Sequence, residues 1–308
     1  MTVSTHIKAY LLAFWLFLLI FNGNHGYAQE LEPRALTNLP VGMNFAVAGY
    51  GFASGNILFD PGLPLEDATA DFHSIVGAYA RAINFFGLSG KVDIIVPYGI
   101  GTWSGVFTGI DTATSRSGFG DIRFRISFNF LGAPALKAKE FAEYRPDKIS
   151  GFSLQIIAPT GQYFSDKLIN LGSNRWVIKP QWGFAKHSEK WIWETYLRVW
   201  FFSNNNDFWG GNEIRQKPLY VIKIHGIRKF KNKSWLALDL GYGNGARSIV
   251  NNELKDNRNS TFRFGVSYAV PLGIQHNLKF TWISDITLEK GADFDALGVS
   301  YQYRWLKK

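Results

Sequence analysis

The chain has 308 residues, of which 16% are aromatic and 19% are charged, and it carries a formal net charge of +9 and no cysteine. Lack of cysteine excludes disulfides, thiolate metal ligands and a lipid-modified cysteine, and a mean hydropathy of -0.06 is too low for a bundle of membrane-spanning helices. Lysine and arginine are spread without a long basic run, so the charge does not indicate nucleic-acid binding.

The first 28 residues have the three parts of a secretory signal peptide. An apolar run over residues 9–21 follows Lys8, and a polar stretch with small residues then ends at Ala28. The apolar run is short for a membrane anchor. We therefore predict export with cleavage after Ala28, which leaves residues 29–308 as one domain; an uncleaved helix is the alternative.

After this signal the chain repeatedly alternates polar and large apolar residues, as a β-strand with two unlike faces does. In the clearest stretch, residues 121–130, Phe124 belongs to the apolar set, whereas Arg123 and Arg125 belong to the polar set. Counting such stretches in chain order predicts about 12 strands. They lie near residues 41–51, 72–86, 91–100, 121–130, 151–159, 175–184, 191–203, 219–230, 235–243, 262–270, 277–286 and 296–306.

The connections between these stretches alternate in length, as they do in outer-membrane β-barrels. Short connections lie at 87–90, 187–190, 230–234 and 271–277, and long ones rich in Gly, Asn and Asp lie at 52–70, 101–117, 160–174, 204–217 and 244–260. The stretch 131–149 is an exception, because it is long where a short turn is expected. Its Ala, Lys and Glu favour a short helix; alternatively, it marks a miscounted pair of strands.

These patterns predict an all-β fold, a closed antiparallel transmembrane β-barrel. Only a helix or an edge-free sheet pairs every backbone group inside hydrocarbon, so we expect the apolar set to face the lipid of a Gram-negative outer membrane and the polar set to face a wet interior. Aromatic residues at strand ends are typical of the two membrane boundaries: Trp176, Trp182, Trp191, Tyr242, Tyr301, Tyr303 and Trp305. A soluble β-sandwich would also alternate, but it does not explain the export signal and the loop pattern together.

The polar set gives the predicted lumen a basic balance. Its cations are Arg123, Arg125, Arg175, Lys179, Arg198, Lys223, Arg263, Lys279 and Arg304, and its carboxylates are Asp121, Glu194, Asp239 and Asp285. These residues can form an electrostatic filter that favours anionic or electron-rich solutes. They can equally form ion-pair networks that brace a narrow interior.

The strand predicted at 191–203 places aromatic rings beside charges. Tyr196 and Trp200 share a face with Glu194 and Arg198, so an aromatic solute could move along it by stacking and cation–π contacts. The alternative is that this face packs against a loop folded into the barrel.

Two further candidates lie in the loop after this strand and in a later strand. Phe208 and Trp209 precede two glycines and could capture hydrophobic solutes, or they could pin the loop to the barrel rim. His225 lies inside a predicted strand, but no nucleophile-elbow or zinc-protease motif accompanies it, so a structural or lumen-lining role is favoured. No loop has the spacing of a calcium-binding EF-hand, and we predict neither a metal site nor catalytic residues.

Several motifs are similar to one protein family. The chain resembles the family described as "Putative MetA-pathway of phenol degradation" in GFGDIRF (118–124), PTGQY (159–163), KLINLGSNRW (167–176), WETYLRVWFFSNNNDFWGG (193–211), QKPLY (216–220) and LGVSYQYRW (297–305). The resemblance implies an outer-membrane barrel associated with uptake of aromatic or hydrophobic compounds. It singles out for test Asn174, Arg175, Trp176, Glu194, Asn206 and His225. The closing RWLKK departs from the aromatic C-terminus usual for barrel assembly, although Trp305 is close to the end.

Together these observations predict a passive outer-membrane channel for small hydrophobic or aromatic compounds, without covalent chemistry or a cofactor. Its partners would be outer-membrane lipid, the solute and the barrel-assembly machinery. The alternatives are a lipid-modifying hydrolase that depends on His225 and a structural or adhesive barrel with a plugged lumen. The sequence leaves open the solute, the oligomeric state, and whether residues 29–40 plug the pore.

Overall fold

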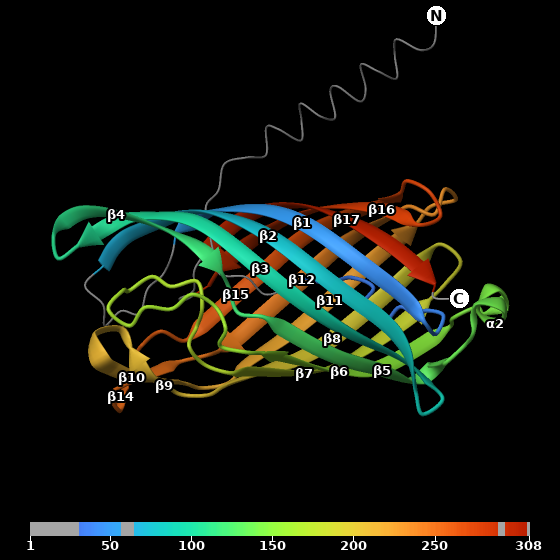
Figure 1. Ribbon diagram of the computed structural model, residues 1–308, viewed down its shortest axis with the longest axis horizontal. Coiled ribbons are helices and arrows are strands. Elements are labelled where there is room, and N and C mark those ends of the chain that lie inside the picture. The colour runs from blue at the N-terminus through green and yellow to red at the C-terminus, as the bar shows by residue number, and fades with distance from the viewer. Residues whose placement is uncertain (1–30, 57–64, 289–292, 307–308) are drawn as a thin grey trace, which may run out of the picture.

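The computed structural model describes residues 31–56, 65–288 and 293–306, and the predicted signal peptide lies outside these residues. In the described residues, twelve antiparallel strands close into one barrel, because β2 pairs with both β1 and β3 (Figure 1). This confirms the predicted fold class and strand number. Around the barrel the strands are β1 (Met43–Asn56), β2 (Leu65–Phe85), β3 (Leu88–Phe107), β5 (Arg123–Pro134), β6 (Lys148–Ile157), β7 (Val177–His187), β8 (Trp191–Phe202), β11 (Leu219–Lys229), β12 (Trp235–Gly245), β15 (Asn259–Pro271), β16 (His276–Thr287) and β17 (Asp293–Leu306).

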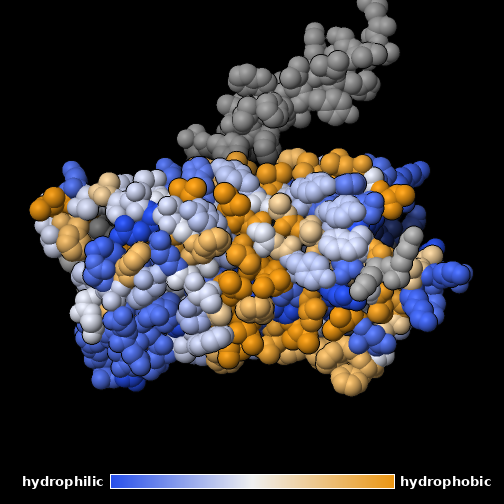
Figure 2. Space-filling view, in the orientation of Figure 1, coloured by the Kyte–Doolittle hydropathy of each residue, from blue (hydrophilic) through white to orange (hydrophobic). Residues whose placement is uncertain are grey.

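The two faces of the barrel wall are the reverse of those in a soluble protein. On β5 the side chain of Phe124 is 47% exposed on the outside, whereas its neighbour Arg125 is 8% exposed on the inside. On β11, outward Tyr220 is 60% exposed and inward His225 is 0% exposed. Figure 2 shows the resulting apolar surface on the visible face of the barrel. This arrangement follows from the period of two, because alternate side chains point to opposite faces of a strand.

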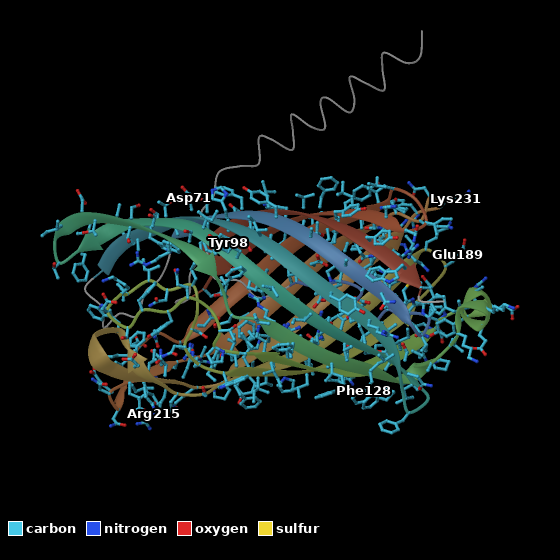
Figure 3. All side chains as sticks on the ribbon, in the orientation of Figure 1. Asp71, Tyr98, Phe128, Glu189, Arg215 and Lys231 are labelled. Atoms are coloured by element: carbon cyan, nitrogen blue, oxygen red, sulfur yellow. The ribbon has the colours of Figure 1, made fainter. Side chains whose placement is uncertain are left out.

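The connections differ at the two ends of the barrel. At one end, here the short-turn end, β2–β3, β7–β8, β11–β12 and β15–β16 are joined by short connections. Glu189 and Lys231, from two of these connections, both lie at this end (Figure 3). The helix α2 (Ala138–Glu143) also lies at this end, between β5 and β6 (Figure 1). The predicted short helix is therefore confirmed, and the interpretation as a miscounted strand pair is wrong. No helix in the described ranges is both long and apolar enough to cross a membrane.

At the opposite, long-loop end, the predicted loops contain strands of their own. The extra strand β4 (Ile110–Phe119) forms a hairpin with β3. A separate sheet contains β9 (Asn205–Phe208), β10 (Asn212–Gln216), β13 (Ser248–Val250) and β14 (Glu253–Leu254), with the short 3-10 helix η1 (Trp209–Gly211) between β9 and β10. The strands of the separate sheet are short, and β4 has few large apolar residues, so the sequence pattern predicts all of them only as loops.

The barrel wall changes its pairing at the level of Pro97. On the short-turn side of Pro97, β3 pairs with β5, and on the long-loop side it pairs with β4. Among the described strands, β4 has β3 as its single partner. The loop 158–175 covers the side of β4 that faces away from β3, and there the Gln162 N–H donates to the carbonyl of Phe119 at 2.8 Å. We call this junction the seam.

Candidate functional site

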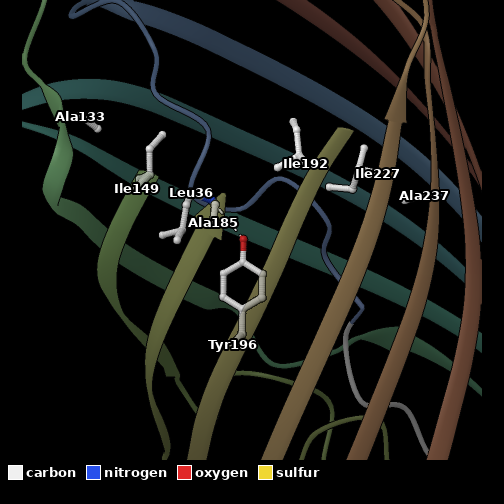
Figure 4. Packing of buried hydrophobic residues seen from close by; sticks show 8 residues of the cluster. All are labelled: Leu36, Ala133, Ile149, Ala185, Ile192, Tyr196, Ile227 and Ala237. Carbon is white, nitrogen blue, oxygen red and sulfur yellow. Dashed lines mark hydrogen bonds between the residues drawn. The ribbon is translucent and has the colours of Figure 1, made fainter. Parts of the chain in front are cut away.

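A segment from before the first strand lies inside the barrel. We call residues 31–42 the N-terminal strap. Leu31, Leu36 and Asn38 of the strap are buried. Figure 4 shows Leu36 seated on the inner side of the barrel wall. Leu36 belongs to an apolar cluster with Ala133, Ile149, Ala185, Ile192, Tyr196, Ile227 and Ala237.

Residues of the barrel wall hold the strap by polar contacts. The guanidinium of Arg125 hydrogen-bonds both carboxylate oxygens of Glu32, with Nη2 to Oε1 at 2.8 Å, and also donates from Nε to Asp93 at 3.0 Å. The backbone N–H of Arg34 donates to Oε2 of Glu194 at 2.7 Å. The hydroxyl of Tyr196 accepts from the Leu36 N–H at 3.4 Å.

Charge complementarity fixes the protonation of the strap carboxylate. Burial alone raises the pKa of Glu32, but the charge and hydrogen bonds of Arg125 outweigh it and hold this pKa well below its ordinary value. Glu32 is therefore ionised, and its ion pair with Arg125 is intact, at neutral pH.

The structure places the predicted lumen residues on the inner face or at its rim. Eight of them are on inward positions of barrel strands, namely Arg123, Arg125, Glu194, Tyr196, Arg198, Trp200, His225 and Arg263, and Arg175 lies directly before β7. Glu194 and Tyr196 face a segment folded into the barrel, as the alternative interpretation of 191–203 expected. That segment is the strap, which precedes the first strand, and not a loop between two strands. Contact of these residues with a solute stays a prediction.

His225 is part of a buried polar network. Its Nδ1 lies 2.6 Å from Oδ1 of Asp239, and the hydroxyl of Ser267 donates to Oδ2 of the same carboxylate at 3.2 Å. The ring of Tyr196 meets His225 edge-on, with centroids 5.4 Å apart. A hydrolytic triad needs the serine hydroxyl on the histidine, whereas Ser267 is bonded to the aspartate. These contacts tie the three neighbouring strands β11, β12 and β15 together.

Other charged residues brace the same wall. Arg263 and Asp285 form a buried ion pair through two hydrogen bonds between neighbouring strands. Arg198 donates from Nε to Oε1 of Gln181 at 2.8 Å. Sequence reasoning missed Glu32, Asp93 and Gln181. Asp93 and Gln181 share the inward parity of their predicted strands, which is a usable signal, but nothing in the sequence links Glu32 to Arg125.

Aromatic rings and cations meet in the half of the lumen nearer the long loops. The ammonium of Lys179 lies 3.5 Å from the ring centroid of Trp200, and the guanidinium of Arg175 lies 4.8 Å from that of Phe202. These rings pack against Leu219 and the apolar residues around it. Burial lowers the pKa of Arg175 to about 10, so the group stays cationic at neutral pH. Such a surface can hold an electron-rich ring.

The predicted capture residues Phe208 and Trp209 lie on the long-loop sheet, at the end of β9 and the start of η1. The loop is tied to its neighbour, because Tyr163 donates to the carbonyl of Asp207 at 2.9 Å and the N–H of Gly210 donates to Ser165 at 3.1 Å. Both aromatic side chains are partly exposed. Their capture of solutes remains a prediction.

Motifs far apart in the sequence meet at the seam. The carboxylate of Asp121 accepts the Gly161 N–H at 2.9 Å and both the N–H and the hydroxyl of Ser173, at 2.9 and 2.7 Å. Next to it, the Asn174 amide donates to Asn205 at 2.9 Å. The motifs GFGD, PTGQY, LGSNRW and SNNNDF thus share one structural task, which is to fasten loop 158–175 over the unpaired side of β4.

The family described as "Putative MetA-pathway of phenol degradation" matches residues 64–303. The chain belongs to this family. The matched range holds the seam and the wall residues named above, whereas the strap and β1 precede it. No curated protein sequence matches the chain.

Solved structures share the fold of this family member. An outer membrane channel from Pseudomonas putida F1 is 21% identical with a TM-score of 0.75, over 90% of this chain and 100% of that chain. The transport unit of the autotransporter AIDA-I from Escherichia coli is 9% identical with a TM-score of 0.52, over 90% of this chain and 93% of that chain. At these identities the likeness concerns the fold alone.

Proposed function

We propose that this protein is a passive outer-membrane channel that admits small hydrophobic or aromatic compounds without covalent chemistry. The observation that carries the proposal is a closed barrel with an apolar outside and an inside that sets cations over the aromatic faces of Trp200 and Phe202. Membership in a phenol-degradation family supports the choice of aromatic solutes.

The orientation of the channel follows from its connections. In barrels of the outer membrane the short turns face the periplasm and the long loops face outward. The strap, α2 and the short turns therefore lie on the periplasmic side, and β4 and the small sheet of β9, β10, β13 and β14 project outward. Export by the predicted signal peptide would deliver the chain to this membrane.

The strap also supports a second candidate, a structural barrel with a plugged lumen. It fills part of the interior through Leu36 and its ion pair at Glu32. Planar-bilayer recordings with the purified protein separate the two functions. Discrete conductance steps are expected for the channel, whereas a silent membrane at high protein content would favour the plugged barrel.

Uptake by cells tests the solute class. Cells that lack this protein should take up phenol-like compounds more slowly than cells that carry it, with little change for a sugar. Replacement of Lys179 and Trp200 by Met and Leu should slow aromatic uptake while the barrel still folds, because it removes the cation–π surface. Equal phenol uptake with and without the protein would refute the proposal.

A further inference from the structure

The start of the strap spans the full width of the lumen. The methyl carbon Cδ1 of Leu31 lies 2.7 Å from the position that a Cβ on Gly265 of β15 would occupy. The next residue, Glu32, is bonded to Arg125 of β5. The strands β15 and β5 are six strands apart in either direction around the twelve-stranded barrel, so they are on opposite sides. The strap therefore divides the lumen into two parts.

One part is filled by side chains. We call it the packed half, and it is bounded by β5, β6, β7, β8, β11, β12 and β15. A Cβ on inward Gly183 would meet the ring of Tyr196 at 2.5 Å, and one on Gly151 would meet Asn129 at 2.4 Å and Leu36 at 2.8 Å. At the level of Gly151 and Gly183, toward the short-turn end, there is therefore no room for a passing solute, whereas Trp200 and Phe202 lie nearer the long loops.

The other part is lined on β17 and β1 by small side chains with space in front of them, whereas toward the long loops the inward Gly99 and Gly101 of β3 are covered by Phe72 and Trp103. We call it the open half, and it is bounded by β16, β17, β1, β2 and β3. A Cβ on inward Gly49, Gly51 or Gly298 would meet only atoms of the adjacent strands, at 3.6 Å or more. These positions are partly exposed, whereas the inward positions of β11 are buried.

We infer that solutes cross the barrel through the open half, between the strap and the small residues of β17, β1 and β2. This inference rests on the proposed channel function and assigns its path. Gly49 and Gly298 set the width of the path. They lie on the neighbouring strands β1 and β17, and only backbone and Cβ atoms would be near a side chain added at either position.

The two sides of this path have different chemistry. The inward positions of β1 from Phe45 to Ala53, and of β2 from Ala70 to Ala82, carry no charge. Facing them are the charges of the strap and its anchor, Glu32 and Arg125. At the long-loop end the open half is bordered by an apolar cluster of Ala68, Ala70, Phe72, Trp103, Ile169, Leu171 and Phe294.

A solute that matches both sides has a small apolar body and a polar group on one edge. A sugar would lay unpaired hydroxyls on the uncharged side, and desolvation of an unpaired polar group is costly. An alkane would make no polar contact with the charged side. A single aromatic ring with a hydroxyl or carboxylate satisfies both sides, since its face is apolar and its substituent can bond to the cations.

The experiment measures flux into liposomes that contain the full mature protein, with protein-free liposomes subtracted. The probes are 4-hydroxybenzoate and glucose. Gly49→Trp and Gly298→Trp would fill the path, and Gly77→Trp is the matched control. Gly77 lies on β2 with nothing within 4 Å of an added Cβ and points outward to lipid. Folding of each variant is checked by its resistance to unfolding in detergent on gels.

We expect 4-hydroxybenzoate flux to exceed glucose flux, to fall at least about tenfold in Gly49→Trp and Gly298→Trp, and to be unchanged in Gly77→Trp. Wild-type protein with no flux of either probe would refute the channel function itself. Flux that persists in both folded inward variants would overturn the assigned path and leave the channel function standing. Equal flux of both probes would overturn the assigned solute class.

Discussion

The packed and open halves of the lumen are built from strands of the same barrel, but their inward residues do opposite things. In the packed half, large polar and aromatic side chains are bonded to one another and to the strap, as Arg198 is to Gln181 and Tyr196 is to the strap. In the open half, glycine and other small residues such as Gly49 and Ser300 leave space. This difference shows that a narrow barrel can hold both a tightly packed interior and a solute path, provided that the packed side chains and the path lie on different sides of the lumen.

The most severe test is removal of Arg125, the cation that anchors the strap to the barrel. Arg125→Met leaves the carboxylates of Glu32 and Asp93 without their partner. We expect a loss of about 3 to 5 kcal/mol in the free energy of unfolding, as for other broken buried ion pairs. Lys279→Met in the open half, where the side chain is partly exposed, should cost less than about 1 kcal/mol. Urea unfolding followed by tryptophan fluorescence measures both, and equal losses would contradict the division.

Replacing one glycine by leucine in each half distinguishes a position that is tightly packed from one that borders the solute path. Gly183→Leu would drive a side chain into Tyr196 and should destabilise the barrel by about 1 to 3 kcal/mol through overpacking. Gly49→Leu should change stability by less than about 0.5 kcal/mol and reduce solute flux. Paired unfolding and flux measurements test this. A destabilised Gly49→Leu variant would show that the open half is also packed.

The seam should be weaker than the packed half. Asp121→Asn keeps the size of the side chain but removes its charge and one of the acceptors used by Gly161 and Ser173. We expect a loss of about 1 to 2 kcal/mol from these charge-assisted hydrogen bonds. Proteolysis of loop 158–175 should become faster before the barrel itself unfolds. If protease sensitivity does not change, Asp121 does not fasten this loop.

The smallest expected effect is that of pH on the strap. Burial raises the pKa of Glu32, but Arg125 lowers it well below the ordinary value of 4.5. The ion pair that lowers this pKa stabilises the docked strap fully at pH values above the ordinary pKa. Its contribution is lost only as the pH falls through the lowered pKa. A spin label on Thr37→Cys should therefore show constant mobility from about pH 8 to about pH 5.

A matched variant completes this test. Adding Glu32→Gln should raise the mobility of the label throughout the same pH range, because the ion pair with Arg125 is gone. Mobility that rises between neutral pH and pH 5 in the unaltered strap would contradict the lowered pKa.

Sequence reasoning succeeded where the signal is local. The alternation of Phe124 and Arg125 predicts both the strand and its two faces, because a period of two is read within ten residues. The short helix α2 was predictable from the helix-forming residues between two strands. The barrel and the inward position of most candidate residues follow from such patterns alone.

The rest depends on contacts between distant residues. Glu32 and Arg125 are 93 positions apart, and no local pattern predicts their ion pair. The inward glycines of β1 look like ordinary strand residues until the strap on the other side of the lumen is known. For the same reason the motifs that meet at Asp121 were predictable as motifs, but their joint role at the seam was not.

The division of the lumen can be measured directly by cysteine reactivity, because the chain contains no cysteine of its own. Ser300 on β17 and Ser267 on β15 both point inward, but Ser300 is partly exposed in the open half and Ser267 is fully buried in the packed half. With a water-soluble thiol reagent, Ser300→Cys should react at least about tenfold faster than Ser267→Cys in the folded barrel. Equal rates at the two positions, or a faster reaction at Ser267→Cys, would contradict the central claim that solutes pass the strap on one side only.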